Sequence, residues 1–261
     1  MIDWWLVQAD ALIVGVIAVL YGLQAALLLG FCFHPRWRAV CDSFAGVVAP
    51  FISFGCVAFA LVAGFMGASV WGRFNETELA VRDEAAAALQ LIRLSEATPQ
   101  FRAAGLIPLT DRYLQVVVEE EWPLLHVRGM SRDAAQAHFR LQSKALGVVT
   151  GGEVGPLLSG ELLRSVNELS RARIKRSNVA QGEHHFMRWL GLLTLGLLAQ
   201  CGVAAVHLKH KRGMGLALTI SSLVIVTTVS MLALSASPFS GSMSVPSDPL
   251  TRVLQRPTLT P

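Results

Sequence analysis

The sequence predicts an all-α integral membrane protein: four transmembrane helices in two hairpins, with a helical extramembrane bundle between them. Three observations support this fold class. Residues 11–33, 43–72, 189–206 and 213–247 carry no charged side chain, and a bilayer core of ~30 Å needs roughly 20 apolar residues per helix. Of the 22 Lys or Arg and 18 Asp or Glu, 15 and 14 lie within 73–188. Hydrophobic residues make up 53% of the chain and charged residues 15%, against about 25% charged in soluble domains.

The uncharged segments divide the chain into four parts. We interpret the first segment as a retained span, because Asp3 and Asp10 precede it instead of the basic region of a signal peptide. The expected parts are a first transmembrane hairpin over 1–72 with spans at about 11–33 and 44–71, an extramembrane domain over 73–185, a second hairpin over 186–236 with spans at about 186–208 and 213–235, and a C-terminal tail over 237–261.

The two short turns between paired spans are basic, which predicts an orientation. Short loops rich in Lys and Arg tend to stay in the cytoplasm. The turns hold Arg36, Arg38, Lys209, Lys211 and Arg212. We therefore expect the turns on the cytoplasmic side of a bacterial inner membrane, with both termini and the central domain in the periplasm. Six basic residues beside the central domain favour the opposite side: Arg73, Arg82, Arg173, Lys175, Arg176 and Arg188.

The central segment has helical periodicity throughout. Residues 76–95 are rich in Ala, Leu and Glu and contain neither Gly nor Pro, so the second span should continue as one long helix until Pro99. Further helices are expected over 110–121, ending near Pro123; from the N-cap Ser131 to Ala145; and over 157–178.

The second span offers the clearest candidate for a pore lining. Phe51, Phe54 and Phe65 recur near one face, while Gly64 and Gly67 mark a face of small residues. Rings of phenylalanine can form an apolar constriction that gates by dewetting. The alternative is that the phenylalanines face lipid and the glycines face a neighbouring helix, which small residues allow to approach closely.

Hydroxyl groups are concentrated in the fourth span. They could bond back to their own helix or line a wet path, and they are Ser221, Ser222, Thr227, Thr228 and Ser230. No span contains an intramembrane Asp, Glu, Lys or Arg. This argues against a proton-coupled transporter, because such proteins usually need a buried titratable group.

Neither a metal site nor a cofactor is predicted. Three consecutive carboxylates, Glu119–Glu121, lie near Trp122 and His126, but the chain has no His-Glu-x-x-His motif and no paired Cys. We expect these carboxylates to form ion pairs instead, with partners among Arg171, Arg173, Lys175 and Arg176. The near-balanced charge of the central segment gives no basic stripe for nucleic acid.

Several short motifs resemble those of one family. They are Tyr113 with Glu120, Glu121, Trp122 and Pro123; the run from Glu168 to Arg173 that includes Arg171; Trp189; and Pro238, Phe239, Ser240 and Gly241. Together with the order of the spans, they resemble the bestrophin-like family of bacterial membrane proteins, a domain of unknown function distantly similar to bestrophin anion channels. One departure is Ala236, where the family commonly has an Asp two residues before the Pro-Phe-x-Gly motif.

The resemblance implies a homo-oligomeric channel for small inorganic ions, with anions favoured and the second helix lining the pore. It also implies a cytosolic soluble part, opposite to the side that the basic turns predict. We expect membrane lipid as a partner, no nucleic acid and no enzymatic activity. The rival hypothesis is a non-conducting membrane scaffold or sensor whose extramembrane helical domain binds a partner protein.

Overall fold

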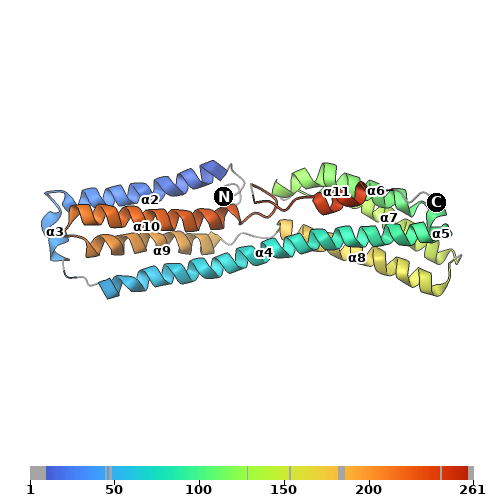
Figure 1. The fold of residues 1–261 in the computed structure, drawn as a ribbon, viewed down its shortest axis with the longest axis horizontal. Coiled ribbons are helices and arrows are strands. Elements are labelled where there is room, and N and C mark those ends of the chain that lie inside the picture. The colour runs from blue at the N-terminus through green and yellow to red at the C-terminus, as the bar shows by residue number, and fades with distance from the viewer. Residues whose placement is uncertain are drawn as a thin grey trace. The chain divides into compact units, whose positions relative to one another are not determined.

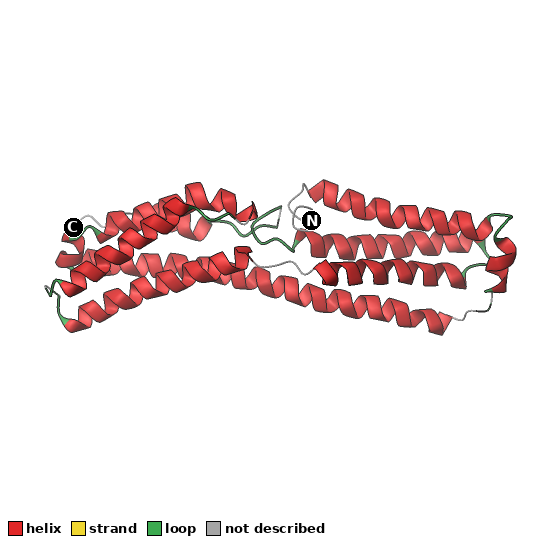
Figure 2. Ribbon diagram, turned by 180° about the vertical axis from the view of Figure 1, so that it is seen from behind, coloured by secondary structure: helices red, strands yellow, loops and turns green. Residues whose placement is uncertain are grey.

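The computed structural model describes residues 10–44, 46, 49–127, 129–152, 154–181, 186–241 and 243–257, without the side chains of 49, 51, 52, 126, 127 and 181. All regular structure within these ranges is helical (Figure 2), as the sequence predicts. The chain forms two compact units. We call residues 1–72, 183–237 and 241–243 the apolar bundle, and residues 73–182, 238–240 and 244–261 the polar bundle.

The apolar bundle contains the four expected long apolar segments. They belong to α2 (Asp10–Phe33), the first part of α4 (Ala49–Ala97), α9 (Phe186–Val206) and α10 (Lys211–Leu234). Each is long and apolar enough to cross a membrane. A short helix that the sequence analysis did not anticipate, α3 (Arg38–Ser43), fills the turn before α4, and Phe44 is its C-cap.

Helices α2, α9 and α10 form the packed core of the apolar bundle (Figure 1). The side chains of Ile13, Ile17 and Tyr21 are buried against residues of α9 and α10 such as Leu192 and Val229. A Cβ atom on Gly196 would lie 2.5 Å from the Tyr21 hydroxyl. Glycine at 196 thus lets α2 and α9 approach closely, as small residues do between membrane helices.

Polar side chains also join these three helices. The Tyr21 hydroxyl donates to the Leu193 carbonyl at 3.2 Å, and the Gln24 amide donates to the Leu197 carbonyl at 2.9 Å. The Gln200 amide donates to Ser222 Oγ at 2.6 Å. Interhelical hydrogen bonds of this kind help to hold helices together where water is excluded.

The polar bundle is built on the second part of α4, which is one unbroken helix to Ala97, as expected. Its other elements are α5 (Pro99–Ala103), α6 (Leu106–Val116), the π-helical turn η1 (Val117–Glu121), the 3₁₀ turn η2 (Trp122–Val127), α7 (Arg132–Thr150), α8 (Pro156–Gln181) and α11 (Asp248–Leu254). Ser131 caps α7 as predicted, because its hydroxyl accepts from the amides of Asp133 and Ala134.

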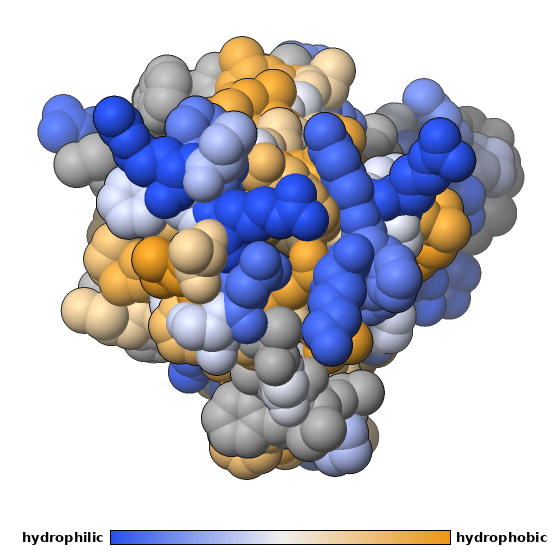
Figure 3. All heavy atoms as spheres, turned by 90° about the vertical axis from the view of Figure 1, so that its left-hand side faces the viewer, coloured by the Kyte–Doolittle hydropathy of each residue, from blue (hydrophilic) through white to orange (hydrophobic). Residues whose placement is uncertain are grey.

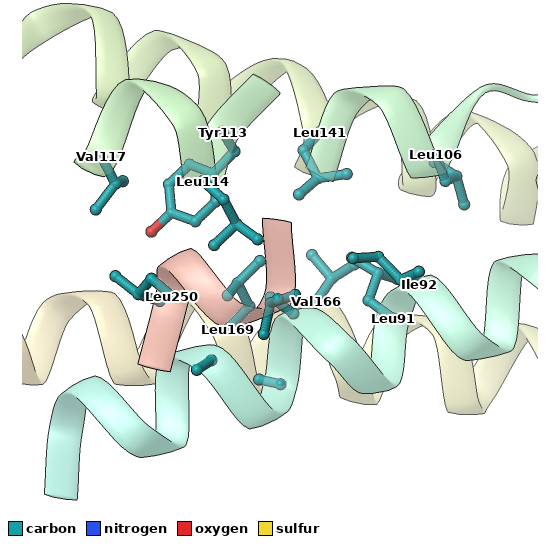
Figure 4. Close-up of a cluster of buried hydrophobic side chains, with 14 of the residues drawn as sticks. Leu91, Ile92, Leu106, Tyr113, Leu114, Val117, Leu141, Val166, Leu169 and Leu250 are labelled. Atoms are coloured by element: carbon teal, nitrogen blue, oxygen red, sulfur yellow. The ribbon is translucent and has the colours of Figure 1, made fainter. Parts of the chain in front are cut away.

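One apolar core runs through the polar bundle (Figure 4). Leu91 and Ile92 of α4, Leu114 of α6, Leu141 of α7 and Leu169 of α8 are all fully buried in it. The segment after 237 was expected to be a tail, but Leu250 of its helix α11 is buried in the same core. The Arg256 guanidinium adds a double hydrogen bond to the Asp111 carboxylate, at 2.6 and 3.0 Å.

Candidate functional site

An exposed apolar stripe runs along α4 within the apolar bundle. Phe54, Val57, Leu61 and Phe65 are spaced by three, four and four residues, so they lie on one face of the helix. Their exposed fractions are 82%, 63%, 58% and 69%. Val57 and Leu61 were not singled out from the sequence, although this spacing between the two phenylalanines would have identified them.

The predicted glycines of α4 lie to one side of the stripe. Gly64 and Gly67 line an apolar hollow of about 730 Å³ formed by α4, α9 and α10. A Cβ on Gly67 would lie 3.4 Å from Leu232 of α10, which is ordinary contact. Gly64 comes seven residues after Val57 and so borders the stripe, whereas Gly67 lies further round the helix. The side chain of Phe51, the remaining pore-lining candidate, is outside the described residues.

Three of the hydroxyls of α10 bond back to their own helix, one of the two alternatives considered. Ser221 and Ser222 both donate to the Leu218 carbonyl, and Thr228 donates to the Val224 carbonyl. Ser221, Thr227 and Thr228 also line the apolar hollow. Such back-bonding removes the cost of placing a hydroxyl in an apolar site.

The polar bundle contains a buried ion-pair cluster centred on Arg176 of α8. Its Nε lies 2.6 Å from Glu84 Oε2, and its Nη2 lies 2.8 Å from Glu121 Oε1. Arg173 Nη2 reaches the other oxygen of Glu121 at 3.1 Å. The side chains of Arg176, Glu84 and Glu121 are 0% exposed. Two guanidinium charges therefore face two carboxylates, so the formal charges of the cluster cancel.

Tyr113, His138 and Ser170 extend this cluster. The Tyr113 hydroxyl donates to Glu84 Oε1. The His138 ring lies edge-on to the Tyr113 ring, with centroids 5.5 Å apart, and its Nε2 is 3.0 Å from Ser170 Oγ. The cluster thus connects α4, α6, η1, α7 and α8 through side chains.

Trp122 and Phe239 cover the other side of Arg176. The Arg176 guanidinium carbon lies 5.7 Å from the centre of the Trp122 ring, a cation–π distance. Phe239 packs edge-on against Trp122, with centroids 5.7 Å apart. Motif residues that are far apart in the sequence, Tyr113, Glu121, Trp122, Arg173 and Phe239, therefore meet in one place.

The π-helical turn η1 separates the roles of the three consecutive glutamates. Glu121 is buried, whereas Glu119 and Glu120 are exposed. Glu119 accepts from the Gln115 amide, and Glu120 lies 3.9 Å from Arg112. The predicted ion pairing with Arg173 and Arg176 is confirmed for Glu121. π-Helical turns are rare and are often found at functional sites.

Burial and charge shift the ionisation of the cluster. Burial and the neighbouring Glu84 carboxylate raise the pKa of Tyr113 well above its ordinary value, so the phenol stays neutral. Burial, together with the nearby Arg173 charge, lowers the pKa of His138. Burial opposes the charge of Arg176 most strongly of any single cause, but Glu84, Tyr113 and Glu121 together outweigh it, and the pKa of Arg176 is raised.

The arrangement of the Arg176 cluster is that of a buried ion-pair network that links helices. Ion pairs and hydrogen bonds already use the carboxylates of Glu84 and Glu121. Among the described residues no group of three or more His, Cys, Asp or Glu could hold a metal ion.

Four motif residues lie away from this cluster. Arg171 and Glu120 are exposed on the polar bundle. Trp189 is buried in the core of the apolar bundle. Gly241 has φ +77°, and a Cβ there would lie 2.8 Å from Asp10 Oδ1. A carboxylate from α2 thus lies at the motif's turn, although position 236 is Ala.

Glu84 and His138 belong to the cluster but were not singled out from the sequence. Glu84 interrupts a buried stripe of α4 that includes Ala80, Ala88 and Leu91. A carboxylate within an apolar stripe at helical spacing is a signal for a buried ion pair, because an unpaired charge would not be tolerated there.

Replacing Arg176 should destabilise the protein far more than replacing Arg171. Arg176→Leu leaves Glu84 buried without its cation, a loss that typically costs about 3–5 kcal/mol. The exposed Arg171→Leu should stay within about 0.5 kcal/mol. Denaturant unfolding of the full chain in detergent, followed by tryptophan fluorescence, measures both. Equal losses for the two variants would contradict a central role for Arg176.

Acidification should weaken the polar bundle through His138. Its pKa is lowered in the folded state, so below the unfolded value of about 6.5 the unfolded chain binds more protons. Stability is therefore present above that value and is lost as pH falls through it. Unfolding midpoints of wild type and His138→Gln from about pH 8 to about pH 5 test this. The variant should show a shallower pH dependence, and parallel curves would rule His138 out.

Comparisons with known proteins find the same fold in solved structures. Three crystal structures of a bacterial bestrophin homologue from Klebsiella pneumoniae, each carrying a point substitution, share the fold. They have TM-scores of 0.69, 0.69 and 0.67, with 16%, 14% and 15% sequence identity, and the similarity covers 93%, 91% and 92% of this chain and 96% of each homologue. No curated protein sequence matches the chain.

The bestrophin-like domain matches residues 18–250. This range contains most of α2, all of α4, α9 and α10, and every residue of the buried cluster. The chain therefore belongs to the bestrophin-like family.

Proposed function

We propose that several copies of this chain assemble into a membrane channel that conducts ions passively through a pore lined by α4. The main support is the exposed stripe of Phe54, Val57, Leu61 and Phe65 on α4. One helix cannot enclose a path, so a pore lined by this stripe requires α4 helices from several copies. A ring of such side chains forms an apolar constriction, which can gate by dewetting.

Two further observations support passive conduction. Residues 11–33, 43–72, 189–206 and 213–247 contain no Asp, Glu, Lys or Arg. These segments therefore offer no charged side chain for coupling transport to protons. The polar groups between α2, α9 and α10 are neutral amides and hydroxyls. We infer that anions are the favoured ions, because the family is named for its similarity to bestrophin anion channels. We propose neither a catalytic residue nor a cofactor.

The arrangement of the spans as two hairpins is part of the same proposal. Helices α9 and α10 are joined by a short turn and pack against each other. The turn before α4 contains α3, and α2 packs mainly against α10. In this arrangement α4 leaves its apolar stripe free, as a pore-lining helix needs. Helices α2 and α10 also expose large apolar side chains, such as Leu27 and Leu223.

The rival function is a non-conducting scaffold whose polar bundle binds a partner protein. One observation favours it: Phe139 and Leu146 of α7, seven residues apart, are 66% and 53% exposed. Large apolar side chains repeated on one helix face often mark an interface.

Flux measurements separate the two functions. Wild-type protein in liposomes should pass chloride faster than empty vesicles do. Phe54→Ala and Phe65→Ala should each raise the flux several-fold, because a smaller side chain widens and wets the constriction. The matched control is Phe139→Ala, which removes an equally exposed phenylalanine of the polar bundle and should conduct like wild type. Wild-type flux equal to that of empty vesicles would favour the scaffold.

Orientation is a separate proposal. The basic turns favour a periplasmic polar bundle, and the resemblance implies a cytosolic one; we retain the periplasmic side. A reporter enzyme that is active only outside the cytoplasm, inserted at the exposed turn around Gly151 and Gly152, should be active. The same reporter at Lys209 should be silent. The reverse pattern would place the polar bundle in the cytosol.

A further inference from the structure

One end of the apolar bundle gathers the basic residues of both short turns. The turn after α2 and the turn between α9 and α10 pack around one shared cluster of buried side chains. Its members are Cys32, Cys41, Ala204, Leu208, Met214 and Leu218. Hydrogen bonds order each turn: the Arg36 amide donates to the His34 ring at 3.2 Å, and the His210 amide donates to the His207 carbonyl at 3.0 Å. The two turns are therefore held side by side.

Charge on this end is strongly one-sided. Five exposed cations lie on the two turns: Arg36, Arg38, Lys209, Lys211 and Arg212. Within the described part of the two turns and α3, the one carboxylate is Asp42, 3.9 Å from Arg38. Figure 3 shows hydrophilic side chains spread across this end, with apolar side chains between and around them. Since the apolar helices end here, we expect the cations at the level of the lipid headgroups.

Aromatic and apolar side chains accompany the cations. Trp37 is 45% exposed and stacks on Phe31, with ring centroids 5.4 Å apart. Val40 and Phe44 beside it are 48% and 61% exposed. Tryptophan is enriched at the boundary between the hydrocarbon core and water. The end thus combines an aromatic anchor at the hydrocarbon boundary with cations in the headgroup layer.

We propose that this end of the apolar bundle is a binding site for the phosphate headgroups of anionic phospholipids. The cations supply the attraction, and Trp37, Val40 and Phe44 lie where acyl chains begin. Clusters of four to eight Lys or Arg next to a membrane span are typical of anionic-lipid recognition. A free phosphate ion would meet the same cations but would gain nothing from the apolar side chains. The site does not depend on ion conduction.

The test titrates the purified full chain in neutral detergent with fluorescent phosphatidylglycerol, and with fluorescent phosphatidylcholine in parallel. Each cation near an anionic surface contributes about fivefold to the affinity. The triple variant Lys209→Gln/Lys211→Gln/Arg212→Gln should therefore bind phosphatidylglycerol about 100-fold more weakly. The matched control, Arg132→Gln/Arg140→Gln/Lys144→Gln, removes the same charge from exposed positions of α7 and should bind like wild type.

Two further arms complete the design. Arg36→Gln/Arg38→Gln should weaken phosphatidylglycerol binding about 25-fold, which keeps the test valid if the triple variant does not fold. Excess inorganic phosphate should not displace the lipid. Equal affinity for the two lipids, equal losses in the α7 control, or full displacement by inorganic phosphate would each overturn the proposal.

Discussion

Arg176 can remain charged inside the polar bundle only because Glu84 and Glu121 meet it there. A buried charge without partners would cost several kcal/mol, so the three elements that carry these groups are held together. Tyr113 and Trp122 complete the surroundings of the guanidinium. Ion pairs of this kind add specificity more than raw stability in some proteins. We expect the cluster to favour one register of α4, η1 and α8 relative to each other.

The apolar bundle follows a different constraint. In lipid the hydrophobic effect cannot drive helices together, so close packing and interhelical hydrogen bonds must do so. Gly196 beneath Tyr21, and the amides of Gln24 and Gln200, provide both for α2, α9 and α10. Helix α4 also contributes Phe59 and Met66 to this core, while its opposite face is exposed. Helix α4, whose exposed face carries the stripe of Phe54, Val57, Leu61 and Phe65, is the one proposed to line a pore.

The proposed channel and the proposed lipid site use different parts of the apolar bundle. Conduction depends on the α4 stripe, which is uncharged. Lipid binding depends on the end of the bundle, where the two turns carry five exposed cations and Trp37. Binding of anionic headgroups at that end would fix how deeply the apolar helices sit in the membrane, because the headgroups form a layer at the edge of the hydrocarbon core. The Arg176 cluster lies in the polar bundle and takes part in neither proposal. Its ion pairs join α4, η1 and α8.

Local patterns allowed much of the fold to be predicted. Uncharged runs long enough for a bilayer identified the four spans, and the absence of Gly and Pro after 75 correctly indicated one continuous helix. The Ser131 cap followed from its position before a helical run. The π-helical turn, α3 and the docked helix α11 were not predicted. Each depends on what the segment packs against, and a single sequence does not record that.

The Arg176 cluster likewise could be predicted only in part from the sequence. Composition and spacing by themselves predicted an all-helical chain with four segments long and apolar enough to span a membrane, because lipid imposes length and apolarity on a span. Motif residues such as Tyr113, Trp122 and Phe239 could be listed from the sequence. Only the tertiary structure decided that they surround Arg176, that Glu84 is its partner, and that the glycines of α4 line an apolar hollow to one side of the phenylalanine stripe. Partners in a buried ion pair lie up to 92 residues apart, and such contacts are determined by packing, not by local pattern.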